Sequence, residues 1–413
     1  MKVFRLKEYS VSGENSLSRC EAERLSAYLR KKKLQNVVSL TPQGIVSKSF
    51  VGVIRCGNVQ IEILPKILSA NDDRREIMEN LVYMLSYTRR LDIRTESGAR
   101  LAACKNPFLE ILIYEYASSL FDCLKKQPLR NYVTEETEVN FIKGKLMLPE
   151  QIRKSCVNRA KFYCQYDEFS ENNMLNRLFL YVAVCLYKLS ENSGNKRILR
   201  RIVNYYADVE PLPVSAAEAN RIALPRNQIL FKKPLSLAKM FVNQCSVDLS
   251  RNKIENVALV WDMNVLFEEF IGEVFKRKCP TLDIELQKGK RLLSEAGTGR
   301  KKCDTFVDIF EKNNKIVIDT KYKEFHSLKD VSNADVFQVM TYCMLHGAKR
   351  AILIYPQYGD VAPDVPVHRL NAASEDLGYA VQFKTVDLRR NLKKPVLNGS
   401  FWRLSKTFPE CFA

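Results

Sequence analysis

Short runs of apolar and β-branched residues, separated by turn formers, mark the start of the chain as rich in strands. Three such runs occur at residues 37–40, 50–56 and 59–64. The pair Gly57-Asn58 between the last two predicts a hairpin turn, and a helical spacing of apolar positions over residues 19–32 predicts one helix. We therefore expect residues 1–68 to form a β-rich N-terminal region.

In the middle of the chain the apolar residues recur three and four positions apart, which is typical of amphipathic helices. The expected helices cover residues 76–89, 107–126 and 172–189. Ser170 stands near the N-cap position of the third helix, and further helices are expected over residues 195–251. Strands interrupt this pattern near residues 132–148, so we expect residues 69–253 to form a mixed, mainly helical middle region.

The last part of the chain, residues 254–413, has the order of elements of a compact α/β domain. Helices are expected over residues 254–278 and 330–346. Strands are expected over residues 282–287, 304–310, 315–321, 351–355 and 379–387. Helix, three strands, helix, strand is the order of a nuclease core, although an order of elements does not by itself establish a function. The whole chain is thus expected to be an α+β and α/β protein of several domains.

The charge balance narrows the possible partners. The chain has 65 Lys and Arg against 47 Asp and Glu, so that 65 − 47 = +18, and its pI is about 9.3. Such an excess favours binding to a polyanion such as DNA, because condensed counterions are then released from the phosphates. A basic surface that only aids solubility is the other interpretation of the same charge.

Two classes of protein are disfavoured by the sequence. No stretch reaches the roughly 18 uninterrupted apolar residues that a membrane helix needs, so we expect a soluble protein with no membrane partner. The twelve cysteines form no C-x-x-C pair and only three histidines accompany them, which argues against a zinc site. Reduced thiols in the cytoplasm are the simplest expectation for these cysteines.

The strongest chemical signal is Asp319-Thr320-Lys321, which ends an apolar run. Strand alternation puts Asp319 and Lys321 on one face of the strand. The preceding strand supplies Asp304 or Asp308, and both have the parity to face Asp319 across an antiparallel hairpin. We favour Asp304, because it leaves a longer hairpin before the turn, and keep Asp308 as the alternative.

These residue types suit phosphodiester hydrolysis. Two carboxylates can hold Mg²⁺, which keeps several waters, lowers the pKa of a bound water and neutralises charge on the scissile phosphate. A lysine two residues past a carboxylate can orient or activate the attacking water and stabilise the developing negative charge. We therefore expect Asp304 and Asp319 to be ligands of Mg²⁺ and Lys321 to be a catalytic residue. The alternative is a solvent-facing strand with a salt bridge.

Two helical positions could complete such a site. Glu268, next to Glu269 on the expected helix over residues 254–278, is a further metal ligand in this interpretation, and an exposed glutamate is the alternative. Gln338 on the helix over residues 330–346 is expected to position water or phosphate, with a packing role as the alternative.

Several stretches together resemble the McrC family, the nuclease subunits of McrBC modification-dependent restriction systems. In chain order they are residues 51–67, 142–146, 166–170 and 263–268, then Asp304, residues 318–322 and residues 335–338. The last three resemble a PD-(D/E)xK, or restriction-endonuclease-like, nuclease core, whose motif expects its first acid at Asp304. Cys303 stands where that motif often has proline, so the entry to this strand departs from the pattern.

The resemblance implies partners as well as a fold. Such proteins work with McrB, a AAA+ GTPase that forms hexameric rings, binds the GTP and recognises DNA carrying 5-methylcytosine. The N-terminal region contacts the ring and stimulates GTP hydrolysis, and the C-terminal domain cuts double-stranded DNA. The sequence agrees with this division, since it contains no G-x-x-x-x-G-K-[ST] loop and no helix-turn-helix that we can identify.

Three hypotheses follow, and the first is favoured. The first is an Mg²⁺-dependent DNA endonuclease subunit that acts in defence against foreign DNA. The second is a non-catalytic adaptor that activates the GTPase ring and has a weak or inactive nuclease fold, and the third is a basic structural nucleic-acid-binding protein. Asp304, Asp319 and Lys321 favour the first, because a decayed site would not retain all three residue types in register.

Overall fold

The computed structural model describes residues 2–12, 17–67, 74–88, 107–154, 161–248, 253–294, 301–358, 368–372, 375–389 and 392. The chain divides into two compact units, one made of Met1–Ile111 and Asn256–Ala413 and the other of Leu112–Glu255. The first and last regions of the sequence therefore belong mostly to one unit. The mixed helical and β character expected from the sequence is present in both units.

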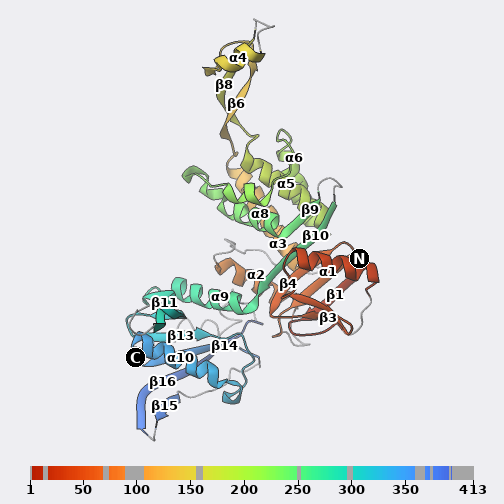
Figure 1. The fold of residues 1–413 in the computed structure, drawn as a ribbon. Helices are drawn as coiled ribbons and strands as arrows, with labels where there is room; N and C mark the ends of the chain where they lie inside the picture. Colours follow the sequence, from red (N-terminus) through yellow and green to blue (C-terminus); the bar gives the residue numbers. More distant parts are fainter. Residues whose placement is uncertain are drawn as a thin grey trace. The chain divides into compact units, whose positions relative to one another are not determined.

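A sheet of five strands has the order β1-β5-β4-β10-β9 (Figure 1), and apart from β9 and the first residues of β10 it belongs to the first unit. Its strands are β1 (Lys2–Lys7), β4 (Phe50–Cys56), β5 (Val59–Leu64), β9 (Cys245–Asp248) and β10 (Lys253–Asp262). β4 and β5 form the predicted hairpin around Gly57, whose φ of 56° suits glycine. The helix α1 (Arg19–Lys31) and the pair β2 (Val38–Thr41) and β3 (Gly44–Ser47) share a buried core with this sheet.

Residues 254–262 form the strand β10, so the prediction that a helix starts at residue 254 is wrong there. β10 pairs antiparallel with β4, and its apolar run is buried on both faces, a pattern that does not distinguish a strand from a buried helix. Gly52 of β4 allows this approach, since a Cβ there would collide with the Leu259 carbonyl oxygen. The helix α9 (Met263–Lys278) begins only after Asp262, whose side chain accepts from the Asn264 N–H.

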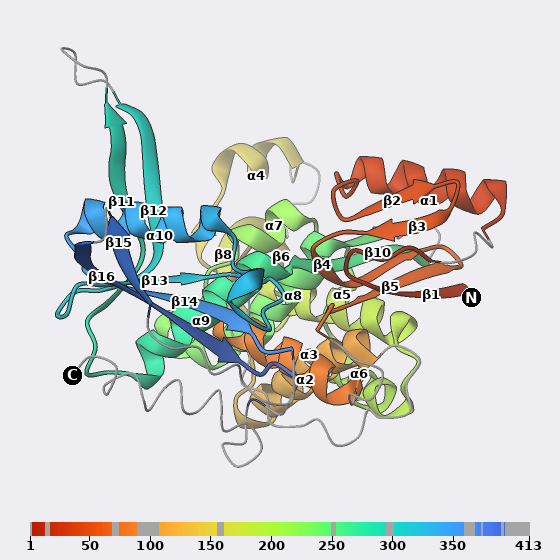
Figure 2. The ribbon, with the colours of Figure 1, turned by 90° about the horizontal axis from the view of Figure 1, so that it is seen from below.

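The second sheet of this unit has six strands in the order β11-β12-β13-β14-β16-β15 (Figure 2). Its strands are β11 (Ile284–Ser294), β12 (Lys301–Glu311), β13 (Ile316–Thr320), β14 (Arg350–Pro356), β15 (His368–Ala372) and β16 (Glu375–Val386). β13, β14 and β16 run parallel, whereas β12 is antiparallel to β13, as the predicted hairpin requires. The sheet contains all the strands expected after residue 280, and β15 in addition.

Helices cover this second sheet. α10 (Asn333–His346), preceded by the short η3 (Leu328–Asp330), is the crossover between the parallel strands β13 and β14. Its Val339 belongs to one buried cluster with Val317 and Leu353 of those strands. α9 contacts the sheet where Gly272 leaves room for a leucine of β11, and it packs on α2 (Arg74–Tyr87).

The second unit is mainly helical, as the sequence predicts. Its helices are α3 (Pro107–Lys126), which begins at the unit boundary, α5 (Met174–Leu189), α6 (Ser193–Tyr205), α7 (Ala216–Arg221), η1 (Arg226–Phe231) and α8 (Lys232–Gln244). The cap of α5 is Asn173, which accepts from the Asn176 N–H, and not Ser170 as predicted, because the preceding strand runs on to Ser170. Within the described residues, no helix combines the length and apolarity needed to cross a bilayer.

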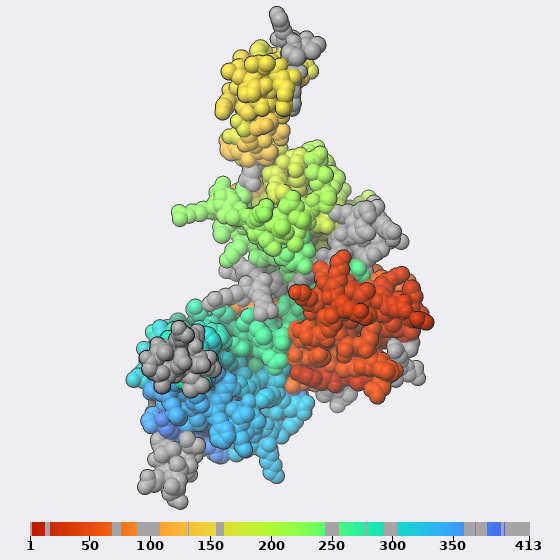
Figure 3. Space-filling view, viewed as in Figure 1, coloured from red at the N-terminus to blue at the C-terminus, as the bar shows by residue number. Residues whose placement is uncertain are grey.

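A three-stranded sheet in the order β6-β8-β7 lies beyond these helices within the second unit (Figures 1 and 3). Its strands are β6 (Asn131–Val139), β7 (Lys145–Leu146) and β8 (Phe162–Ser170), and α4 (Leu148–Lys154) follows β7. The strands expected near residues 132–148 are thereby confirmed. Several large apolar side chains of the sheet, of the loop between β6 and β7 and of α4 are exposed, among them Tyr132, Phe141 and Ile152.

Candidate active site

The hairpin β12–β13 brings two aspartates together in the six-stranded sheet. Ile309 pairs with Ile318, so the next residues along the two strands, Asp308 and Asp319, come opposite each other. Asp308 Oδ2 accepts hydrogen bonds from the Thr320 N–H at 2.9 Å and from the Thr320 hydroxyl at 3.1 Å. The acid beside Asp319 is therefore Asp308, which the sequence had left as the alternative.

Asp304 does not join this pair, and the expectation that it faces Asp319 is wrong. It lies four residues before Asp308 on β12, or about 13 Å along the strand, and it comes opposite Arg291 of β11. β12 pairs with β13 through Ile309–Glu311. β13 ends at Thr320, so the shared part of the hairpin is too short to reach Asp304.

Lys321 lies directly after β13 and contacts both the strand and the helix α10. Its Nζ lies 2.6 Å from Asp319 Oδ2 and donates a hydrogen bond to Gln338 Oε1 at 2.9 Å. Gln338 Nε2 in turn donates to the Tyr342 hydroxyl at 2.7 Å, one helical turn further along α10. The structure thus joins Asp319, Lys321 and Gln338, which the sequence had singled out separately.

Glu268 on α9 belongs to the same group of charges. Burial raises the pKa of Glu268 to about 7, and the negative charges of Asp308 and Asp319 contribute to the shift. Its carboxylate accepts a hydrogen bond from the side chain of Gln287 on β11. The structure therefore places Glu268 within electrostatic reach of both aspartates, and not on an open surface.

The aspartates and the lysine shift one another's pKa. Burial and the charge of Asp308 raise the pKa of Asp319 to about 7, against the opposing effect of Lys321. Burial also raises the pKa of Asp308, against the hydrogen bonds from Thr320. Burial acts to lower the pKa of Lys321, but the charges of the nearby carboxylates outweigh it and the pKa is raised. Three acids and one ammonium form a cluster with an excess of negative charge.

This donor set suits a small divalent cation. Asp319 is 1 % exposed, and its Oδ1 accepts no hydrogen bond from the described residues. Within the described ranges, no three Asp, Glu, His or Cys side chains are already gathered as a complete ligand set. Mg²⁺ is commonly held by one or two carboxylates and completes its shell with water and phosphate oxygens. Asp308 and Asp319 are therefore the residues that could hold such a cation.

The segment that carries Lys321 is fastened to the five-stranded sheet through Tyr322. The Tyr322 hydroxyl donates to Glu8 Oε2 at 2.9 Å, and Lys66 Nζ donates to the Tyr322 carbonyl at 3.1 Å. The Lys66 N–H also donates to Glu8 Oε2, at 2.9 Å. Glu8 follows β1 and Lys66 follows β5, so the ends of two neighbouring strands fix the backbone next to Lys321.

The helix α10 holds the same segment from its other side. Lys323 Nζ lies 2.8 Å from a carboxylate oxygen of Asp335 in the first turn of α10. Ser332 caps that helix by accepting a hydrogen bond from the Asp335 N–H at 3.1 Å. The helix start and the residues after β13 are therefore held together next to the acidic cluster.

Several residues of this site were not identified from the sequence. Tyr342 follows Gln338 by four residues, a helical spacing that could have indicated their contact. Thr320 stands inside the recognised triplet, but its bond to Asp308 depends on the hairpin register. The contact between Glu8 and Tyr322 joins positions 314 residues apart, which no local pattern signals.

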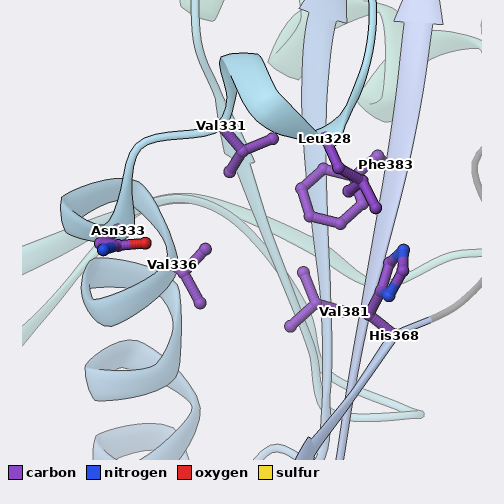
Figure 4. A pocket seen from close by; sticks show the side chains of 7 residues that line it. All are labelled: Leu328, Val331, Asn333, Val336, His368, Val381 and Phe383. Carbon is purple, nitrogen blue, oxygen red and sulfur yellow. The ribbon is translucent and has the colours of Figure 1, made fainter.

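A pocket on the same domain has a different character (Figure 4). Its lining residues come from η3, α10, β15 and β16 and the turn between η3 and α10: Leu328, Val331, Asn333, Val336, His368, Val381 and Phe383. None of these is an acid or a lysine. The pocket is mostly apolar and does not include the acidic cluster.

Comparisons with known proteins agree on one family. A family model described as "McrBC 5-methylcytosine restriction system component" matches residues 45–356. A chain of the refined half-complex from a tetradecameric assembly of Thermococcus gammatolerans McrB AAA+ hexamers with bound McrC is similar to this chain, with a TM-score of 0.76 and 20 % identity over 99 % of this chain and 100 % of that chain. No match is found among curated proteins.

A second solved structure is less similar. A chain of the Thermococcus gammatolerans McrBC complex has a TM-score of 0.54 and 22 % identity, over 67 % of this chain and 88 % of that chain. At such identities both structures show a shared fold and no more.

Proposed function

This chain belongs to the McrBC 5-methylcytosine restriction system component family, and we propose that it is the Mg²⁺-dependent DNA endonuclease subunit of such a system. In this proposal the six-stranded sheet, with α9 and α10, is a PD-(D/E)xK nuclease domain. The reaction is hydrolysis of phosphodiester bonds in double-stranded DNA that carries a modified base such as 5-methylcytosine. The enzyme is then a type IV restriction endonuclease subunit.

One observation carries this proposal. Asp308 and Asp319 meet at the end of a hairpin, and the Lys321 ammonium lies 2.6 Å from Asp319 Oδ2. Burial raises the pKa of both aspartates, because neither has enough positive charge around it to balance its own. A buried acidic cluster of this kind is unfavourable for stability and is expected where a cation is to be bound.

The proposed roles follow from the contacts. Asp308 and Asp319 would hold the metal, and Glu268 would be a further acid beside it. When bound, Mg²⁺ supplies a water of lowered pKa and neutralises charge on the scissile phosphate. The nearby carboxylates raise the pKa of Lys321, which favours the ammonium form, so in this proposal Lys321 stabilises the developing negative charge. Gln338 orients that ammonium through its hydrogen bond.

The proposed partner is a AAA+ GTPase hexamer. The solved chain that is similar to 99 % of this chain comes from an assembly of McrB AAA+ hexamers with bound McrC. By that analogy this chain binds an McrB-like ring, which binds the GTP and selects the DNA, and the β-rich region over residues 1–68 makes the contact that stimulates GTP hydrolysis.

The experiment is a cleavage assay with the full chain, its GTPase partner, GTP, Mg²⁺ and methylated duplex DNA. We expect cutting by the wild type, no cutting by Asp319→Ala or Lys321→Ala, and unchanged stimulation of GTP hydrolysis in both variants. Cutting at the wild-type rate by both variants would contradict the assigned site.

The same assay tests the adaptor hypothesis. If the wild type stimulates GTP hydrolysis but never cuts, with Mg²⁺ or Mn²⁺, the chain is an adaptor and the nuclease proposal fails. A truncated chain lacking residues 1–68 that still stimulates GTP hydrolysis would contradict only the assignment of the partner-binding region.

A further inference from the structure

Strands β11 and β12 continue past the rest of their sheet as a two-stranded ribbon, which projects from the sheet in Figure 2. β12 pairs with β11 over its whole length but with β13 only from Ile309 onward, so residues 301–308 and the facing part of β11 form the ribbon. At about 3.3 Å per residue, these eight positions of β12 span about 23 Å. The ribbon starts at Asp308, one of the two aspartates of the acidic cluster.

The β11 side of the ribbon is basic. Lys290 and Arg291 are both exposed, and Arg291 comes opposite Asp304. Within the described part of the chain, Lys290 makes no ion pair. Burial and the positive charges of Lys288 and Lys290 lower the pKa of His346, at the end of α10. These lysines bring positive charge to the point where the ribbon leaves the sheet, beside the acids Glu285, 3.0 Å from Lys288, and Asp304, opposite Arg291.

An exposed aromatic ring lies between this basic stretch and the acidic cluster. Phe306 is 53 % exposed and precedes Asp308 by two residues. It comes opposite Gly289, and a Cβ at that glycine would lie 2.8 Å from Phe306 Cε1. The ring therefore lies against the bare backbone of β11 and presents its other side to solvent. An isolated exposed phenylalanine needs no explanation, but one packed over a glycine between lysines and carboxylates has the features of a contact surface.

We propose that the ribbon β11–β12 is the duplex-binding element of this chain, with Arg291 on the DNA backbone and Phe306, on the same face, against the nucleotide next to the one that is cut. Lys290 lies on the opposite face of the ribbon and contacts the DNA backbone from there. The assignment rests on the proposed nuclease function and specifies how its substrate is held. A two-stranded ribbon fits the major groove, which is about 12 Å wide. A length of about 23 Å covers about seven base pairs at 3.4 Å each.

Another explanation of the same residues is protection of a sheet edge. β11 is the first strand of its sheet, and lysines on an edge strand discourage pairing with a second chain. That explanation predicts no change in DNA affinity on charge reversal and no association of the variants, because a glutamate on an edge strand also discourages pairing. The proposal predicts the opposite for DNA, so the two are separated by one binding measurement.

The test measures fluorescence anisotropy of a labelled duplex titrated with the full chain, with Ca²⁺ in place of Mg²⁺ to prevent cutting, at several salt concentrations. Lys290→Glu/Arg291→Glu is expected to weaken binding about tenfold or more and to reduce the slope of log K against log salt by about two. Lys31→Glu/Lys48→Glu, an equal charge change at exposed positions of the N-terminal part, is the matched control and is expected to bind as the wild type does.

The aromatic contact has its own variants. Phe306→Ala is expected to weaken binding about tenfold with an unchanged salt slope, since stacking and not charge is lost, and Phe306→Trp is expected to restore it. Equal thermal melting temperatures of the variants and the wild type would exclude unfolding as the cause.

Each outcome decides the proposal. Ribbon variants that bind duplex DNA as tightly as the control pair, or a wild-type chain with no salt-dependent affinity for the duplex, would overturn it. If the ribbon variants lose affinity but the wild type never cuts DNA with its partner, the ribbon assignment stands and the nuclease function fails. If the wild type cuts and the ribbon variants cut and bind normally, the nuclease function stands and the ribbon assignment fails.

Discussion

Glu8 and Asp319, two buried carboxylates that belong to different sheets, differ in what surrounds them. Glu8, after the strand β1, is 3 % exposed, and Asp319, in the strand β13, is 1 % exposed. Burial is the main cause that raises the pKa of each to about 7. Each also has one oxygen that accepts no hydrogen bond among the described residues. Burial alone therefore does not distinguish them.

The groups around each carboxylate distinguish Glu8 from Asp319. Glu8 accepts hydrogen bonds from the neutral Tyr322 hydroxyl and from a backbone N–H, contacts that suit a link between two sheets. Asp319 lies beside Asp308, whose charge raises its pKa further, and beside one ammonium, that of Lys321. A buried acid among other acids is stabilised by a cation, whereas Glu8 already has hydrogen-bond donors and the positive charge of Lys66, which acts to lower its pKa. We therefore propose a catalytic role for the region of Asp319 and a positioning role for the region of Glu8.

The largest expected effect is that of changing Asp319. Asp319→Asn is expected to lower the cleavage rate roughly a thousandfold or more, since it removes a proposed metal ligand, and yet to raise the stability of the metal-free protein at pH 8. A calorimetric melt in EDTA and a single-turnover cleavage assay measure the two quantities. A variant that lost both activity and stability would show that Asp319 is a structural acid like Glu8.

The second comparison is between the two aspartates of β12. At saturating DNA, so that an effect of Asp304 on duplex binding through the ribbon does not enter, Asp308→Asn is expected to lower the cleavage rate roughly a hundredfold or more. Asp304→Asn, a matched change about 13 Å along the same strand, is expected to stay within about threefold of the wild type under the same condition. Both rates come from the same cleavage assay. The reverse ranking would mean that the metal ligand is Asp304, the residue first expected from the sequence.

The third effect is expected at the link between the sheets. Tyr322→Phe removes one donor to Glu8 and is expected to cost about 1–2 kcal/mol of the free energy of unfolding and to lower kcat about tenfold, with KM for DNA unchanged, because the backbone next to Lys321 is less well fixed. Chemical denaturation and steady-state cleavage kinetics give these values.

Tyr355→Phe is the control for that variant. The Tyr355 hydroxyl is buried and has no hydrogen-bond partner among the described residues, so its loss is expected to cost little stability. Equal losses of stability in Tyr322→Phe and Tyr355→Phe would mean that the hydrogen bond from Tyr322 to Glu8 does not stabilise the protein.

The smallest effect is a pH dependence of stability. The folded-state pKa of Asp319 and that of Glu268, both about 7, lie above the ordinary values of 3.8 and 4.5. The folded protein therefore binds more protons than the unfolded chain between about pH 4 and pH 7, and in EDTA its stability should fall as the pH rises through that window. Saturating Mg²⁺ should reduce this fall, and Asp319→Asn should reduce it without metal. A melting temperature independent of pH from 5 to 8 in EDTA would contradict the raised pKa values.

Much of the fold follows from local patterns, and the errors have physical reasons. The helix α3 has the predicted bounds because Pro107 starts it and a long apolar face continues it. Residues 254–262 were misassigned because a strand buried on both faces has no alternation, and only its pairing with β4 decides the conformation.

The site was predictable to a different extent. Asp319 and Lys321 follow from two-residue alternation within one strand, and Gln338 from its place on the next helix. The choice between Asp304 and Asp308 depends on how far the hairpin extends, which strand parity does not fix. The positioning residues Glu8 and Lys66 come from the other sheet, and only the tertiary structure brings them to Tyr322.

The most direct test of the central claim is isothermal titration calorimetry of the full chain with Mn²⁺ at neutral pH. The account predicts binding by the wild type and by Asp304→Asn, and loss of that binding in Asp308→Asn and Asp319→Asn. Binding that survives in Asp308→Asn and Asp319→Asn, or that disappears only in Asp304→Asn, would contradict it.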